Sequence, residues 1–279
     1  MSYSNYHSHS NYCDGKGSLQ DYVTEALSLG MKSYGFSSHC PIPYQSEWSM
    51  KEEDLSKYMS EILFLKEKYK DSIELYVGLE LDYFPEDKVY LGNIQSAKLD
   101  FSIGSIHFID FIDEFTPWEI DGSNQKFEKG FQEIFNGNIQ NVVKRYFELT
   151  RLMVRDLNPT IVGHIDKLKI QNHYYNYFLE QDRYYQEEVF ETIDFISQTS
   201  SFIEVNTRGL YKNKTKEAYP SAWILKRILE KKIPIVLNSD SHATREIVAK
   251  FDETTELLKT LGFKERMELR KGVWKTVKL

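Results

Sequence analysis

The chain has 279 residues, of which 41% are apolar and 14% aromatic, so it can bury the core of one large α/β domain or of two smaller ones. A formal net charge of −7 and a pI near 5.6, with no basic run, argue against binding to nucleic-acid backbones or anionic membranes. No apolar stretch approaches the roughly 18 residues of a membrane span, and no signal-peptide pattern opens the chain, so we expect a cytoplasmic protein.

The first predicted element is a short strand that runs into the motif HSH, in SNYHSH at 4–9. Side chains alternate along a strand, so His7 and His9 point the same way and Ser8 points opposite. Two imidazoles on one side can bind one metal ion. On this tripeptide alone, two partly exposed histidines are an equally good interpretation.

Six further strand candidates share a feature with the first. Each is rich in β-branched and aromatic residues and ends in a polar residue suited to metal or phosphate chemistry. They are SYGFSSH (33–39), IELYVGLE (73–80), FSIGSIH (101–107), TIVGH (160–164), FIEVNTR (202–208) and IPIVLNSDSH (233–242).

The segments between these strands have the apolar spacing of helices. Segment 18–30 has Ser18 as an N-cap and Gly30 as a C-terminal stop, and segment 52–70 is apolar on one face. Alternating strands and helices predict parallel strands with right-handed crossovers. Polar residues at the end of every strand favour a β/α barrel over an open doubly wound sheet, which gathers its ligands at one switch point. The other helical patterns cover about 139–156, 182–198, 220–231 and 245–261.

Two irregular stretches interrupt the pattern, 109–138 after His107 and 209–222 after Arg208. Both should overhang the strand ends. For the longer stretch, a lid or binding loop and a decorative insertion are equal alternatives.

The histidines are distributed unevenly. Of the seven in the chain, six fall at the ends of strand candidates, and only His173 does not. Carboxylates at the same ends bring the number of candidate donors to nine, more than the four to six ligands that one ion takes, so we expect two or three metals. Mixed imidazole and carboxylate donors favour Zn, Mn or Fe over Mg or Ca. The nine are His7, His9, Asp14, His39, Glu80, His107, His164, Asp240 and His242.

For two of these carboxylates the sequence predicts more than ligation. Glu80 is the natural bridge between metals, because a carboxylate has two oxygens. Asp240 and His242, in DSH, are two residues apart on a predicted strand and should therefore face the same cavity.

Six motifs in this order resemble those of the polymerase and histidinol phosphatase (PHP) family. They are HSH, SSHCP (37–41), GLELDY (78–83), GSIHF (104–108), GHID (163–166) and NSDSH (238–242). Among the branches of the family, GLELDY, GSIHF and EVNTRG are most similar to the histidinol-phosphate phosphatases. The resemblance implies a single domain over 1–279, a distorted (β/α)7 barrel with a trinuclear metal centre at the C-terminal ends of the strands.

Position by position, the resemblance implies three metal sites that share ligands. Many relatives have a histidine near the position of Asp14, and this departure implies weaker or exchangeable occupancy of the third site. The first site would use His7, His9, Glu80 and Asp240, the second Glu80, His107 and His164, and the third Asp14, His39 and His242.

The chemistry expected of such a centre is attack on a phosphate ester by a metal-bridging hydroxide, with Asp240 and Arg208 as catalytic residues. Arg208 suits a bidentate phosphate contact and resembles a phosphate-binding arginine of the family, although a salt bridge at the rim is the alternative. Asn206 should share its face if the strand continues. Tyr219 and Ser221 are weaker candidates for hydrogen bonds to the substrate.

The substrate implied by the resemblance is L-histidinol phosphate, a small phosphate ester of histidine biosynthesis; the oligomeric state stays open. A negative wall would favour its amine and imidazole, and Asp82, Glu119, Asp121 and Asp166 lie close to the motifs, although each alone is more typical of a solvated surface. Two alternatives are kept. The first is another PHP phosphoesterase, such as a phosphotyrosine-protein phosphatase or an exonuclease. The second is a non-catalytic metal-binding interaction module.

Overall fold

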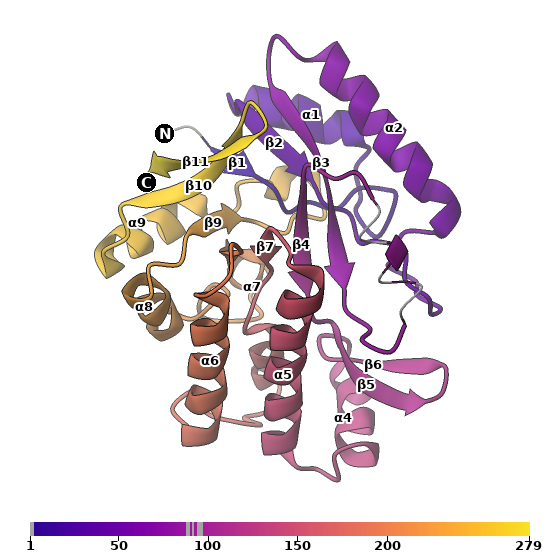
Figure 1. The fold of residues 1–279 in the computed structure, drawn as a ribbon, viewed down its shortest axis with the longest axis vertical. Helices are drawn as coiled ribbons and strands as arrows, with labels where there is room; N and C mark the ends of the chain where they lie inside the picture. The colour runs from indigo at the N-terminus through magenta and orange to yellow at the C-terminus, as the bar shows by residue number, and fades with distance from the viewer. Residues whose placement is uncertain (1–2, 88–89, 91, 94–96) are drawn as a thin grey trace.

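The computed structural model describes residues 3–87, 90, 92–93 and 97–279. Its centre is a seven-stranded sheet in the order β1-β2-β3-β4-β7-β8-β9, in which every neighbouring pair is parallel (Figure 1). All seven predicted strands are confirmed, and most end before the polar residues that follow them. The strands are β1 Ser4–Asn5, β2 Ser33–Phe36, β3 Glu74–Asp82, β4 Phe101–Ser105, β7 Ile161–Val162, β8 Phe202–Asn206 and β9 Ile235–Asn238.

The first and last strands of the sheet are joined beyond their ends. Ser8 and Ser241 form an isolated parallel bridge, and the backbone N–H of His9 donates to the carbonyl oxygen of Ser241 at 2.8 Å. These contacts make the sheet a nearly closed barrel of seven parallel strands, as predicted.

Helices cover the outside of the barrel. Ser18 caps α1 in a capping box with Asp21, and Gly30 follows the helix with a φ of +70°, as expected for its C-terminal stop. The segment predicted as one helix over 245–261 is instead divided, because Lys250 adopts a left-handed φ of 64° between a 3₁₀ turn and α9. The elements are α1 Leu19–Ser28, α2 Glu52–Lys68, α5 Ile139–Leu157, η1 Lys167–His173, α6 Arg183–Ile196, α7 Arg208–Tyr211, α8 Ala222–Glu230, η2 Thr244–Glu246 and α9 Phe251–Leu261.

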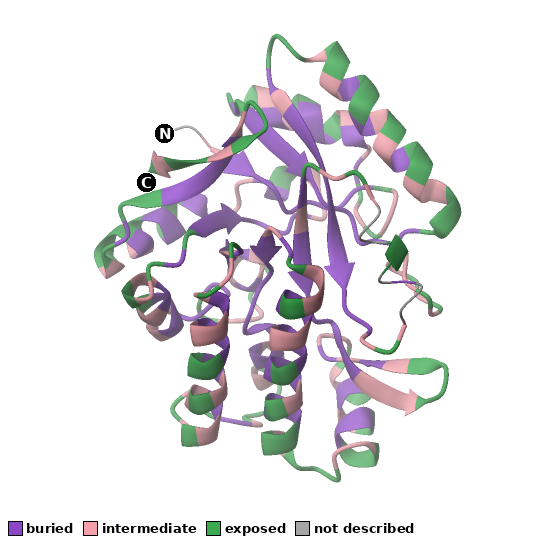
Figure 2. Cartoon of the chain, in the orientation of Figure 1, coloured by how far each residue is buried: buried purple, intermediate pink, exposed green. Residues whose placement is uncertain are grey.

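The core lies between the sheet and these helices. The seven strands of the central sheet are buried along nearly their whole length, and the helices expose only their outer faces (Figure 2). No helix among the described residues is long and apolar enough to cross a membrane.

A C-terminal hairpin closes the end of the barrel opposite the predicted site. It consists of β10 Glu265–Arg270 and β11 Val273–Lys278 and was not predicted. Trp274 contacts Phe101 and Phe202, the first residues of β4 and β8, with ring centroids 6.3 and 5.2 Å apart. The polar end of the strands therefore remains the open end.

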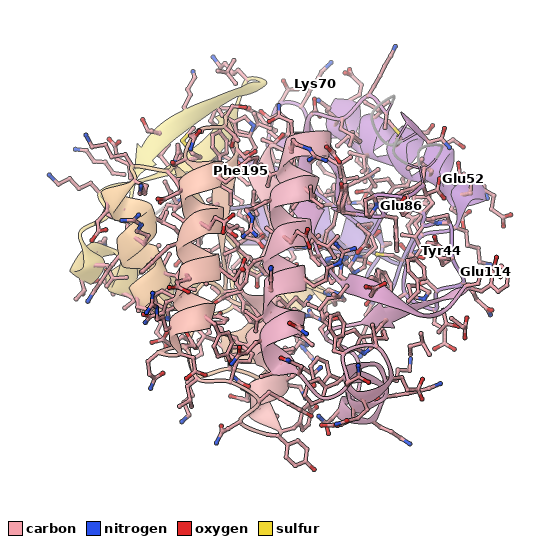
Figure 3. All side chains as sticks on the ribbon, turned by 60° about the horizontal axis from the view of Figure 1, so that its bottom comes forward. Tyr44, Glu52, Lys70, Glu86, Glu114 and Phe195 are labelled. Carbon is pink, nitrogen blue, oxygen red and sulfur yellow. The ribbon has the colours of Figure 1, made fainter. Side chains whose placement is uncertain are left out.

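The stretch 109–138 is a folded insertion. A hairpin of β5 Phe108–Asp113 and β6 Thr116–Glu119 is followed by α4 Asn124–Glu133, and Trp118 is buried beneath this helix at Gly130. Tyr44, from the loop after β2, contacts the ring of Phe111 in the hairpin. Figure 3 labels Tyr44 and Glu114, the latter at the hairpin tip, on the same side of the molecule. The insertion begins directly after His107, so it stands beside the ends of β3 and β4.

Candidate metal centre

All nine predicted donors gather at the C-terminal end of the barrel. Within each of four groups of side chains, one ligand atom per residue lies within 4.8 Å of the others. The groups share members, so they form one continuous cluster. They are His9, Asp14, His39 and His242; His7, His9 and Asp240; His7, Glu80 and His164; and His39, Asp82 and His107.

Glu80 lies at the centre of the cluster. Its Oε1 lies 2.9 Å from His164 Nε2 and 3.6 Å from His107 Nε2. Its Oε2 lies 3.0 Å from His39 Nδ1 and 3.2 Å from His7 Nε2. His9 Nε2 also lies 3.5 Å from Oε2, so the two oxygens face different sets of imidazoles, which is the arrangement required of a bridging carboxylate.

Asp240 faces the same cavity as His242, but for a different reason from the one predicted. The strand ends at Asn238, and Asp240 itself has a φ of +52°, which is uncommon for a residue with a side chain. The turn places Asp240 Oδ1 3.2 Å from His9 Nε2 and 3.5 Å from His242 Nδ1. Strained backbone of this kind is typical of functional sites.

Asp14 lies at the open side of the cluster. Its Oδ2 is 3.2 Å from His242 Nε2, and its Oδ1 is 3.9 Å from both His9 Nδ1 and His39 Nε2. One third of its side chain is exposed, whereas seven of the other eight donors are buried and His242 is 11% exposed. The structure therefore places Asp14 beside the other two members of the third predicted group. Asp14 is the most exposed donor of the cluster.

Two buried carboxylates orient the imidazoles. His7 Nδ1 donates to Glu204 Oε1 at 2.6 Å, and His107 Nδ1 donates to Asp82 Oδ1 at 2.9 Å. The Nε2 atom of each ring therefore points towards Glu80, as in the carboxylate–histidine pairs that support metal ligands. The expectation of a solvated surface was wrong for Asp82, which is fully buried. Glu204 was missed, although it stands two residues before Asn206 on one strand face.

The charges in the cluster are strongly coupled. Burial alone would raise the pKa of Glu80, but His7, His39 and His107 hold it well below its usual range. Burial, reinforced by His242 and His39, lowers the pKa of His9 well below 6.5. Against the effect of burial, Glu204 and Asp82 in turn raise the pKa values of His7 and His107. These two rings must therefore release a proton when they bind a cation, whereas Glu80 is already ionised.

Several buried nitrogens in the cluster have no hydrogen-bond partner, namely His7 Nε2, His9 Nε2 and His39 Nδ1. Buried polar atoms nearly always have one. These nitrogens converge on Glu80 and Asp240, so the cluster fits divalent cations that would take up their lone pairs.

A cavity of about 210 Å³ opens onto the cluster, and two cationic side chains line it. Arg208 Nη1 donates to the carbonyl oxygen of Asp240 at 2.8 Å and lies 2.7 Å from His242 Nδ1. Lys167, which was not predicted, lies with its Nζ 2.9 Å from Asp121 Oδ2 and 3.3 Å from His107 Nε2. The cavity therefore joins the cluster to positive charge suited to a phosphate group.

Asn206 does not share a strand face with Arg208, because β8 ends at Asn206 and α7 begins at Arg208. The Asn206 amide donates to Glu204 Oε2 at 3.0 Å and to Asp240 Oδ2 at 3.3 Å. It supports two carboxylates of the site and is not among the described residues that line the cavity.

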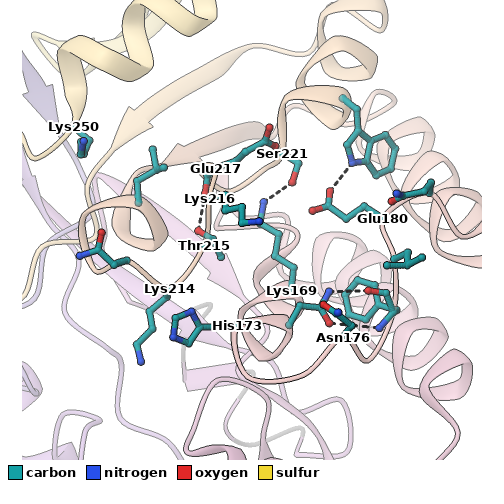
Figure 4. Close-up of a pocket in the computed structure, with 17 residues that line it drawn as sticks. Lys169, His173, Asn176, Glu180, Lys214, Thr215, Lys216, Glu217, Ser221 and Lys250 are labelled. Carbon is teal, nitrogen blue, oxygen red and sulfur yellow. Dashed lines mark hydrogen bonds between the residues drawn. The ribbon is translucent and has the colours of Figure 1, made fainter.

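Tyr219 and Ser221, predicted to bind substrate, are not among the described residues that line the cavity. The hydroxyl of Tyr219 is buried with no hydrogen-bond partner, and Ser221 Oγ accepts from Lys169 Nζ at 2.6 Å. Figure 4 shows this bond in a neighbouring cavity of about 1090 Å³, which Ser221 lines together with His173. His173 is exposed there and takes no part in the cluster, as predicted.

Known proteins resemble this chain in sequence and in fold. The chain is 27% identical to the probable histidinol-phosphatase of Schizosaccharomyces pombe, over 95% of this chain and 89% of that protein. It is likewise 27% identical to the histidinol-phosphatase of Bacillus subtilis, over 86% of this chain and 94% of that protein. The structure of the Lactococcus lactis histidinol phosphate phosphatase, complexed with zinc, L-histidinol and phosphate, superposes with a TM-score of 0.74 at 22% identity, covering 98% of each chain. Residues 5–208 match the PHP domain, and the chain therefore belongs to the PHP family.

Proposed function

We propose that this protein is a metal-dependent phosphomonoesterase that hydrolyses L-histidinol phosphate to L-histidinol and inorganic phosphate, a step of histidine biosynthesis. The observation that carries the proposal is the cluster of nine imidazole and carboxylate donors around Glu80. The histidinol-phosphatases among its relatives support the choice of substrate. The proposal includes a single domain over 1–279, a cytoplasmic location and no nucleic-acid partner.

The proposed metal ligands follow the three groups expected from the sequence. Two or three zinc, manganese or iron ions would be held, and Glu80 would be shared between two of them. When bound, such ions lower the pKa of a coordinated water and neutralise negative charge on the phosphate group. The groups are His7, His9, Glu80 and Asp240; Glu80, His107 and His164; and Asp14, His39 and His242.

The other side chains bind and orient the reactants. Arg208 attracts the phosphate dianion into the cavity, and its planar guanidinium fixes the orientation of the phosphate. Lys167 lines the same cavity, but its charge is paired with Asp121. Asp240 lines the same cavity as an ionised carboxylate that accepts a hydrogen bond from the attacking water. Glu204 and Asp82 hold the rings of His7 and His107 in place.

The test is phosphate release from a panel of esters by protein loaded with zinc, manganese or iron. The panel contains L-histidinol phosphate, a phosphotyrosine peptide and a single-stranded oligonucleotide. We expect kcat/KM for L-histidinol phosphate to exceed the others by about 100-fold or more, because a site built for one substrate leaves polar groups unpaired with another. Preference for the peptide or the oligonucleotide, or no hydrolysis with any metal, would contradict the proposal.

A further inference from the structure

We propose that Glu119 is the carboxylate that recognises the primary amine of the substrate, and that it restricts the enzyme to phosphate esters carrying an ammonium group near the phosphate. The inference rests on the proposed function and adds to it the residue that selects the substrate. Four acidic residues lie near the motifs, and the structure distinguishes among them by their partners.

Three of the four are already engaged. Asp82 is fully buried and accepts a hydrogen bond from His107. Asp166 is fully buried too, and its Oδ2 accepts from Lys169 Nζ at 2.8 Å and from the backbone N–H of Ser221 at 3.0 Å. Asp121 lines the cavity, but its charge is paired with Lys167 at 2.9 Å. None of these three offers an unpaired negative charge to a ligand.

Glu119 keeps its charge available. It is the last residue of β6 and lines the cavity beside the cluster. Its Oε1 accepts a hydrogen bond from the indole N–H of Trp48, which is a neutral donor. Among the described residues, its ion pair is with Lys126, whose Nζ lies 3.9 Å from Oε2 and whose side chain is 70% exposed. A solvated pair at that distance neutralises little of the carboxylate charge.

The position of Glu119 suits an amine that extends from a bound phosphate. Glu119 and Trp48 line both the cavity at the cluster and a second groove of about 680 Å³, which also contains Phe108 and Phe115. A phosphate held beside Arg208 therefore directs the rest of the ester past Glu119 towards this aromatic groove. In L-histidinol phosphate the ammonium group lies between the phosphate and the imidazole, so it reaches this boundary first.

The chain fixes the carboxylate at that boundary. A Cβ atom on Gly122 would lie 2.7 Å from Glu119 Oε2, so the carboxylate occupies space that only a glycine leaves free. The indole of Trp48 holds the other oxygen. A carboxylate held on both sides loses little freedom when it binds a cation, which favours tight and selective recognition.

The test compares L-histidinol phosphate with its analogue that lacks the amine. Glu119→Gln keeps an oxygen for Trp48 and removes the charge. We expect kcat/KM for L-histidinol phosphate to fall about tenfold or more, mainly through KM, and kcat/KM for the analogue to stay within about twofold. Asp110→Asn is the control, because it removes an exposed charge from the same hairpin, and it should change neither value.

A second variant tests position without removing charge. Gly122→Ala displaces the Glu119 carboxylate, so we expect it to reduce the preference for the amine in the same direction as Glu119→Gln. Equal losses on both substrates, or an unchanged preference in either variant, would overturn the proposal.

Binding of L-histidinol and of its analogue without the amine, measured by calorimetry, separates this inference from the proposed function. We expect the metal-loaded wild type to bind L-histidinol more tightly and Glu119→Gln to bind the two alcohols alike. Failure of the wild type to hydrolyse any ester would refute the proposed function. Equal binding of the two alcohols by the wild type would refute the role of Glu119.

Discussion

At the scale of single residues, Glu80 holds the cluster together. Its two oxygens face different imidazoles at 2.9 to 3.6 Å, two at Oε1 and three at Oε2, and the side chain is 1% exposed. The three imidazole nitrogens that face Oε2 have no hydrogen-bond partner, which is costly in a buried site unless a cation takes up their lone pairs. We therefore propose that the charge of Glu80 is required for two neighbouring cation sites.

We expect Glu80→Gln to lose bound metal and to lower turnover by orders of magnitude, because it keeps the size of the side chain and removes its charge. Metal analysis and phosphate release are measured on the same preparation. His173→Ala is the matched control, since this exposed histidine lies outside the cluster, and it should retain both. A Glu80→Gln protein with normal metal content and rate would refute the bridging role.

Variants of Arg208 can separate the contribution of phosphate binding from that of metal binding. We expect Arg208→Ala to lower kcat/KM about 100-fold, equivalent to about 3 kcal/mol of transition-state stabilisation, with metal content unchanged. Arg208→Lys should not restore the rate, because lysine keeps the charge and loses the planar fork. If either variant keeps its metals and a near-normal efficiency, Arg208 is only a rim contact of Asp240 and His242.

The sequence predicted which donors come together better than it predicted the residues that orient them. Six histidines at strand ends could be recognised together because each follows an apolar strand. Glu204 lies inside the strand FIEVN, and no local pattern marks it as the partner of His7, 197 residues away. Asp82 and Glu119 looked alike in the sequence, because burial and pairing depend on the tertiary fold.

At the scale of elements, the strand ends place the donors. The parallel strands were predictable because each combines β-branched residues with a polar end. The hairpin β10–β11 was missed, since its turn, Lys271–Gly272, carries a weaker signal than Asn-Gly, although both residues have the positive φ of a tight hairpin turn. The hairpin in 109–138 was obscured by Pro117 and by an irregular register.

The close packing of β4 against α5 can be tested by a substitution at Gly104. A Cβ atom on Gly104 would lie 2.3 Å from Met153 Sδ and 2.8 Å from Pro159 Cγ. We therefore expect Gly104→Ala to lower the free energy of unfolding by about 1 to 3 kcal/mol in urea titrations. Gly92→Ala is the control, because a Cβ atom there meets nothing within 4 Å. Equal stability of the two variants would contradict this packing.

At the scale of the whole molecule, the site depends on closure of the barrel. Donors from residue 7 to residue 242 meet because the segments after β1 and β9 pair with each other. The apolar core lies between sheet and helices, apart from the cluster, so the fold has its own source of stability.

We therefore expect chelation to abolish turnover and to leave the fold largely intact. Phosphate release and circular dichroism, recorded before and after treatment with a chelator, check both parts. Re-addition of metal should restore the rate. Full activity in the chelated protein, or loss of its secondary structure, would contradict this prediction.

The central claim is that nine donors form a centre for more than one cation, and the most direct measurement is the metal content of active protein. Elemental analysis of protein purified without a chelator, paired with its rate on L-histidinol phosphate, gives the number of metal equivalents per chain. The geometry around Glu80 predicts more than one transition-metal equivalent in fully active preparations. A reproducible value at or below one, with full activity, would contradict the account.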